Sequence, residues 1–269
     1  MSANQNESFG DILLHHVTND LNYIYLPLHL FGVDISITKH VIMLWIVGVL
    51  TICLALYGTQ RYRRNINATP KGLSHLYELL MDFIRNDIIR PNIGNKYGNF
   101  WLPLITTYFI FILTANLLGL IPIFELIPGG SSTVTGNFAV TVALATITFF
   151  AIIVAGSMKH GFVGYWKHMI PSNVPAPVLL ILIPIEIMGM FIRPIALTLR
   201  LGANMTAGHI GMVAIFGLPI LLQSVGVGII SVMLNTGIFF LEIIISLVQA
   251  YVFTLLSSVF IGLAINAEH

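Results

Sequence analysis

Five long apolar segments alternate with short polar connections along the chain. They cover residues 40–58, 100–123, 137–156, 177–217 and 219–266. Each is close to or longer than the roughly 20 residues that a helix needs to cross the hydrocarbon of a bilayer. Apolar residues run continuously in these segments instead of alternating, which favours helices over the strands of a membrane barrel. The pattern predicts an all-α integral membrane protein with about five membrane-embedded helices.

The last two segments are each about twice as long as a single crossing requires. A single helix of that length must be steeply tilted, whereas a segment that folds back on itself needs a break. Residues compatible with such breaks are Pro184, Pro194, Gly226 and Gly228. We expect two long, tilted helices, and the sequence also permits broken ones.

A sixth segment, residues 70–93, has a different pattern. Its apolar side chains recur at spacings of three and four, at Leu76, Leu79, Leu80, Phe83, Ile84, Ile88 and Ile89. Between them lie the charged residues Glu78, Asp82, Arg85, Asp87 and Arg90. This is too many charges for a bilayer crossing, so the segment is predicted to be an amphipathic helix in the membrane interface.

Composition and charge extend this picture. Of the 269 residues, 57% are hydrophobic and only 9% are charged, against about a quarter charged in an ordinary soluble domain. Lys and Arg concentrate in residues 60–98 and 157–176, which the positive-inside rule places in the cytoplasm. Residues 1–39 then form an extracytoplasmic arm, and residues 40–269 form a single transmembrane helical domain. If the last two segments each cross once, the C-terminus is cytoplasmic.

Two further features exclude other classes. The first 39 residues lack a basic start followed by a short apolar core, so we expect no cleavable signal. The only cysteine, Cys53, excludes an intrachain disulfide and a cysteine-based metal cluster. We expect no metal, no cofactor and no nucleic-acid ligand.

Charged side chains inside the apolar segments are the candidate functional residues. Glu186, Arg193 and Arg200 are spaced seven apart on one helical face, and Asn204 continues that face. A buried charge in a membrane is costly, and Arg keeps its charge at any ordinary pH. The intramembrane acids, Glu186 and Glu242, only match the two arginines in number. We therefore expect a partner chain to supply a carboxylate that faces Arg200. The alternative is that Arg200 lies in a water-filled cavity.

The other polar positions allow more than one interpretation. Glu186 and Arg193 also fit a structural ion pair near the cytoplasmic end of their helix. Gln249 lies seven residues after Glu242, on the same face. His209 and Glu242 fit either a structural hydrogen-bonded pair or steps in a proton path. Two scattered ligands are too few for a metal site.

Three motifs resemble a known family. LTLRLGANMTAGHI (197–210) and LVQAYVFTLLSSVFIGLAI (247–265) resemble the two signature helices of subunit a of F-type ATP synthase. ANLLGLIP (115–122) resembles the second-span motif of that family. The order of the segments from residue 40 to the C-terminus also fits.

This resemblance implies a role for each matching residue. Arg200 matches the essential arginine that faces the proton-carrying carboxylate of the rotor ring, and Asn204 and Gln249 match polar positions beside it. Glu186 and Arg193 match residues on its cytoplasmic side, and His209 and Glu242 match a pair lining the outer route. Gly119 stands where some relatives carry an aspartate, and Asn137 stands where many do, so the resemblance leaves an acidic step at the outer entrance open.

The resemblance implies a non-catalytic stator subunit with two proton half-channels, which couples proton translocation to rotation and ATP synthesis. Its implied partners are the rotor c-ring, the peripheral-stalk b subunits, other ATP synthase subunits and membrane lipid. A bacterial plasma (inner) membrane is expected, with the mitochondrial inner membrane as the alternative. Other functions that fit the residues are a secondary transporter in which Arg200 binds an anion, and a purely structural assembly subunit.

Overall fold

The computed structural model describes residues 24–26, 29–30, 33–34, 37–64, 71–121, 134–168 and 176–266. Five helices are long and apolar enough to cross a membrane. They are α2 (Lys39–Arg64), α5 (Asn95–Gly119), α6 (Phe138–His160), α8 (Ala176–Leu222) and α9 (Val225–Ile265). The predicted all-α membrane fold, with five spans of which the last two are long, is confirmed.

Short strands precede the first helix. Strand β1 (Ile24–Leu26) pairs antiparallel with β4 (Ile37–Thr38), and β2 (His29–Leu30) pairs antiparallel with β3 (Val33–Asp34). The sequence placed these residues in the N-terminal arm without predicting strands. Each ladder has only two strands of two or three residues, which is too little to make a sheet stable by itself.

The predicted amphipathic segment is helical, but it is not one regular helix. It comprises α3 (Leu73–Phe83), a π-helical turn (Ile84–Ile89) and α4 (Arg90–Ile93). Pro91 has no backbone N–H and cannot continue a regular hydrogen-bond ladder, which accounts for a change of register near this point. Ile84 and Ile88 are fully buried in the protein core, whereas Leu76 is 63% exposed. Only the first half of the segment therefore presents its apolar side chains outward.

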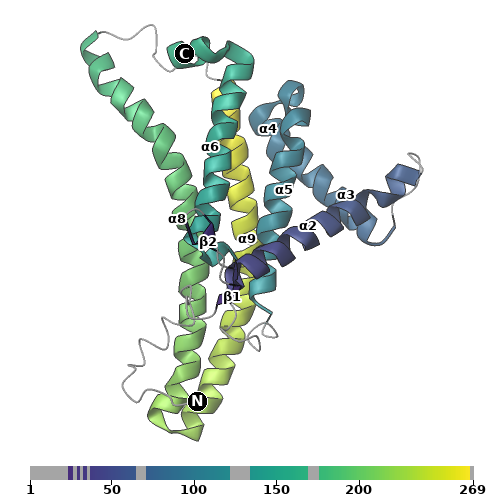
Figure 1. Cartoon of the computed structure of the whole chain (residues 1–269), viewed down its shortest axis with the longest axis vertical. Helices are drawn as coiled ribbons and strands as arrows, with labels where there is room; N and C mark the ends of the chain where they lie inside the picture. Colours follow the sequence, from purple (N-terminus) through teal and green to yellow (C-terminus); the bar gives the residue numbers. More distant parts are fainter. Residues whose placement is uncertain are drawn as a thin grey trace.

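Helices α8 and α9 are each continuous. Helix α8 passes through Pro184, Pro194 and Pro219 and ends at Leu222, and α9 begins at Val225 after a tight turn. The turn includes Gln223 with a φ of 47°. At 1.5 Å per residue the two helices are roughly 70 and 60 Å long, which is consistent with the expected tilt. They lie side by side from their connecting turn, and α8 diverges toward its N-terminal end (Figure 1).

Helix α9 is at the centre of the fold and packs against α4, α5, α6 and α8. Its C-terminal end is held at two points. A ring nitrogen of His160, Nε2, lies 3.2 Å from the Ile265 carbonyl oxygen, and Asn266 Nδ2 donates to the Asn92 carbonyl oxygen at 3.4 Å. The basic residues Arg90, Lys96 and Lys159 belong to elements that meet at this end. The α8–α9 turn lies at the opposite end (Figure 1), which the positive-inside rule makes the outer one.

Candidate functional site

Helix α8 has one covered face and one uncovered face. On the covered face, Leu197 and Leu201 are buried, and the Thr198 hydroxyl donates to the Thr141 carbonyl oxygen of α6 at 3.5 Å. The uncovered face carries Leu199, Arg200 and Ala203. Arg200 therefore points away from the helices of its own chain.

Arg200 lies near the middle of α8, about 35 Å from either end at 1.5 Å per residue. Among the side chains that the structure describes, Arg200 has no ion-pair or hydrogen-bond partner. Glu242 is only 2% exposed and lies on the buried face of α9. The side chain of Glu186 lies outside the described residues. The geometry leaves Arg200 open to a group supplied by another molecule.

Asn204 and Gln249 join the two long helices next to Arg200. Asn204 lies one turn beyond Arg200, and its Nδ2 donates to Gln249 Oε1 at 3.3 Å. Gln249 is 3% exposed, and its own Nε2 finds no acceptor among the described residues. The two residues that sequence motifs placed beside Arg200 are thus brought together across the α8–α9 interface.

Glu242 reaches from α9 to the backbone of α8 at Gly208. A Cβ at position 208 would overlap with Oε1 of Glu242, so this close approach requires glycine. His209 is the next residue, but no hydrogen bond between it and Glu242 is found in the described structure. His209 Nε2 and Glu242 Oε2 are both buried without a protein partner there. Buried polar atoms of this kind are normally satisfied by water, so the two groups can act through bridging water.

Arg193 lies in the N-terminal half of α8 and contacts α9 differently. Its guanidinium carbon lies 5.5 Å from the centre of the Phe260 ring. A cation over an aromatic face is attracted by the ring quadrupole. This contact gives Arg193 a partner within the chain, in contrast to Arg200.

A second buried polar group was not identified from the sequence. Asn116 of α5 is fully buried, its Nδ2 lies 3.5 Å from the Ser246 carbonyl oxygen of α9, and its Oδ1 accepts from the Thr135 hydroxyl. The sequence feature that could have identified Asn116 is an amide side chain in an otherwise apolar span, within the motif ANLLGLIP. Asn137, by contrast, caps α6 by accepting from the Ala139 backbone N–H at 2.9 Å. Its role here is local.

Polar side chains of α9 form a stripe along its buried face. Along that face the described structure leaves several buried atoms without a protein partner, namely Asn235 Oδ1, Glu242 Oε2, Ser246 Oγ and Gln249 Nε2. Such a stripe is suited to holding water in a row and relaying protons. No cluster of three or more His, Cys, Asp or Glu side chains that could hold a metal ion occurs in the described ranges.

The chain was compared with known proteins. The family model described as ATP synthase A chain matches residues 41–262. ATP synthase subunit a of Pelodictyon phaeoclathratiforme is 42% identical over 273 residues, which cover 97% of this chain and 78% of the relative. ATP synthase subunit a 2 of Chlorobaculum tepidum is 40% identical, over 98% of this chain and 75% of the relative. These matches confirm the family that the sequence motifs indicated.

The family assignment agrees with the geometry of the two long helices and their polar groups. It also makes the chain a proton-channel subunit without a catalytic site of its own. The chain belongs to the ATP synthase A chain family and is a multi-pass membrane protein, the stator subunit a of the Fo sector of ATP synthase.

Proposed function

We propose that Arg200 faces the proton-carrying carboxylate of each passing subunit of the rotor c-ring. One observation supports this proposal most directly. Arg200 is exposed at the middle of α8 and has no ion partner among the described side chains. Ala203 on the same uncovered face is small, so another helix can approach closely.

The rotor carboxyl group changes between a protonated and an ionised form as it passes Arg200, and burial and charge determine which form is favoured. A neutral, protonated carboxyl group can travel through lipid on the rotor, whereas an ionised one pays a large burial cost. A fixed guanidinium favours ionisation of the carboxyl group beside it. Protons are therefore released and taken up on either side of Arg200. Its permanent positive charge also repels a hydronium ion, which prevents direct leakage between the two half-channels.

The remaining site residues divide between the half-channels. In this proposal Asn204, His209, Glu242 and Gln249 serve the outer one, on the side of the α8–α9 turn. Glu186 and Arg193 lie toward the other end of α8, at the cytoplasmic side. The Asn204–Gln249 hydrogen bond and the placement of Glu242 against Gly208 support the outer group.

The peripheral-stalk b subunits and surrounding lipid complete the proposed environment. The outward-facing apolar residues of α3, such as Leu73 and Leu76, are available to either. We also propose that the protein resides in a bacterial plasma (inner) membrane, because its relatives include subunits from Pelodictyon phaeoclathratiforme and Chlorobaculum tepidum.

Disulfide cross-linking to the rotor subunit tests the proposal. In a Cys53→Ser background, Ala203→Cys is paired with a cysteine placed next to the rotor carboxylate, and Leu201→Cys is the matched control. We expect Ala203→Cys to cross-link under oxidation and Leu201→Cys not to, because Leu201 is fully buried against the chain's own helices. Cross-linking of Leu201→Cys alone would place the rotor on the wrong face and refute the proposal.

A further inference from the structure

Helix α7 (Phe162–His168) lies beyond the C-terminal end of α6, at the basic end of the molecule, and packs against α6. It follows α6 after Gly161, a glycine with a φ of 75°. The ring of Tyr165 is buried against α6 at Gly156, where a Cβ would overlap with ring atoms of Tyr165. This contact fixes one side of α7 to the rest of the protein.

Another side of α7 is apolar and uncovered in the described structure. Phe162 is 65% exposed, Val163 is 66% exposed and Trp166 is 40% exposed. The first two precede Trp166 by four and three residues, so all three side chains lie on neighbouring positions of one helical face. We call these three residues the apolar face of α7. A group of apolar side chains of this kind indicates contact with another protein or with a membrane.

The size of the apolar face favours lipid over protein. At 150–250 Å² per large side chain, its three residues expose roughly 300 Å². A stable protein interface buries about 800 Å² on each partner. A bilayer sets no such minimum, and Trp is enriched where a membrane meets water.

The charges around α7 determine which lipid fits. Lys159 precedes the helix and is exposed, and Lys167 belongs to the helix. Residues 126–185 contain no Asp or Glu, and Lys159 has no ion-pair partner among the described side chains. The positive-inside rule places this end in the cytoplasm, where the leaflet carries anionic lipids that attract Lys.

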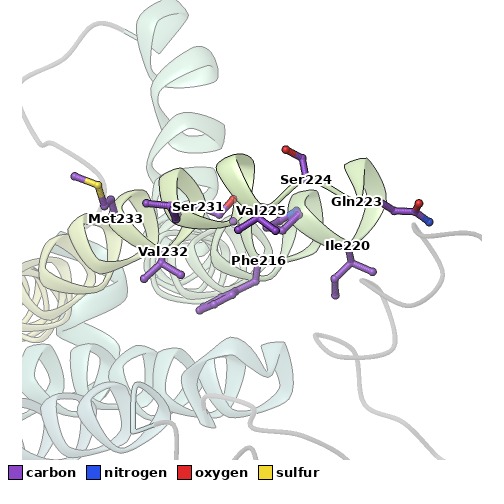
Figure 2. A pocket seen from close by; sticks show the side chains of 11 residues that line it. Phe216, Ile220, Gln223, Ser224, Val225, Ser231, Val232 and Met233 are labelled. Carbon is purple, nitrogen blue, oxygen red and sulfur yellow. The ribbon is translucent and has the colours of Figure 1, made fainter.

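The opposite end of the molecule lacks this combination. Between the end of α8 and the start of α9 lies a cavity with a mostly apolar lining, and Figure 2 shows the side chains of Phe216 and Ile220 among those around it. None of the residues that line it in the described structure is charged. An apolar surface next to unpaired lysines is therefore a property of the α7 end.

We propose that α7 is a membrane-surface anchor that selects anionic phospholipid in the cytoplasmic leaflet. Its apolar face inserts among the upper parts of the acyl chains. Lys159 and Lys167 bind the phosphate of the headgroup, which lysine recognises as a point charge. This inference concerns a surface separate from Arg200 and goes beyond the proposed function.

Lipid bound at α7 also acts on α9. His160 is next to Lys159, and its Nε2 lies 3.2 Å from the Ile265 carbonyl oxygen at the end of α9. A headgroup held by Lys159 therefore fixes the depth at which the ends of both α6 and α9 lie in the membrane.

Fluorescence quenching tests the insertion of the apolar face. Val163→Cys is made in an otherwise cysteine-free complete ATP synthase, labelled with a bimane fluorophore and reconstituted in nanodiscs that contain phosphatidylcholine with a nitroxide on its acyl chain. Val49→Cys on α2 is the matched control for lipid contact, because Val49 is 61% exposed on a membrane-spanning helix. Asn266→Cys, exposed after the end of α9, is the control for a site in water. We expect strong quenching at positions 163 and 49 and little at 266.

The same labels test the selection of the headgroup. Nitroxide-labelled phosphatidylglycerol, which is anionic, is compared with labelled phosphatidylcholine at the same mole fraction. At position 163 we expect phosphatidylglycerol to be enriched by about fivefold for each lysine, and at position 49 we expect no difference. Lys159→Gln with Lys167→Gln should remove the enrichment, whereas Lys159→Arg with Lys167→Arg should keep it.

Three results would overturn the proposal. Quenching at position 163 as weak as at 266 would mean that water or another subunit covers the apolar face. Equal quenching by the two lipids at position 163 would mean that α7 does not select anionic headgroups. Enrichment that persists in the assembled double Gln variant would show that the two lysines do not bind the headgroup.

Discussion

Arg200 and Arg193 show how the same side chain can have different roles within one helix. A guanidinium inside a membrane is costly and cannot shed its proton. Arg193 is met by the Phe260 ring, whereas Arg200 meets no partner in the described part of the chain. This difference supports an intermolecular role for Arg200 and an intramolecular one for Arg193.

Gly208 provides a prediction at the residue scale. Because a Cβ there would overlap with the Glu242 carboxylate, Gly208→Ala should displace Glu242 and reduce ATP-driven proton pumping by roughly ten- to a hundredfold, the usual cost of a misplaced functional group. Gly211→Ala, three residues further along α8, has no atom within 4 Å of the new Cβ. It should pump normally. Equal pumping by the two variants would show that the position of Glu242 does not matter.

The sequence identified some of the site residues and missed others for a physical reason. Arg200 was recognisable because a charged side chain in an apolar helix is costly to bury. The intramembrane acids equal the intramembrane arginines in number, so the chain has no additional carboxylate for Arg200. Asn116 and Asn235 were weaker indications of a functional site, because an uncharged amide can lie on any of several faces of a membrane-spanning helix. Their burial depends on which helices pack against them, and helical periodicity does not reveal that.

At the scale of elements, the two long helices owe their continuity to packing as well as to sequence. Proline inside a helix removes one hydrogen bond and can kink or break it. The sequence therefore left both outcomes open at Pro184 and Pro194, and the structure has one unbroken α8. The π-helical turn before α4 could not be predicted from the sequence either, because the apolar spacing at 84–89 is compatible with an ordinary α-helix.

The contact between α4 and α9 yields a stability prediction. A Cβ at Gly262 of α9 would overlap with the backbone carbonyl of Asn92, and overpacking of this kind typically costs about 1–3 kcal/mol. Gly262→Ala should therefore lower the thermal stability of the subunit in the detergent-solubilised complex. Gly237→Ala is the control, because no atom lies within 4 Å of its Cβ. An unchanged melting temperature for Gly262→Ala would mean that α4 and α9 do not pack closely at this position.

In the whole molecule, the distribution of charge predicts the sidedness, and the structure gathers the basic elements α4, α5 and α6 at one end. At the basic end, the C-terminal end of α9 contacts both the C-terminal end of α6 and α4, and the α8–α9 turn lies at the other end. The order in which the helices surround α9 was not predictable, because apolar faces of similar composition can pair in several ways.

Sidedness is testable by labelling. In a Cys53→Ser background, Ser224→Cys in the α8–α9 turn should react with a membrane-impermeant maleimide only from the outer side. Asn266→Cys, after the end of α9, should react only from the cytoplasmic side. Both residues are exposed. Labelling of the two cysteines from the same side would mean that α9 does not cross the membrane.

ATP-driven proton pumping by the assembled complex carrying Arg200→Ala shows whether Arg200 acts on a carboxylate of the rotor. If Arg200 works on a carboxylate of the rotor, pumping should be abolished while the amount of assembled complex stays close to that of the wild type. Coupled pumping at near wild-type rates in this variant would show that Arg200 is not needed at the rotor carboxylate.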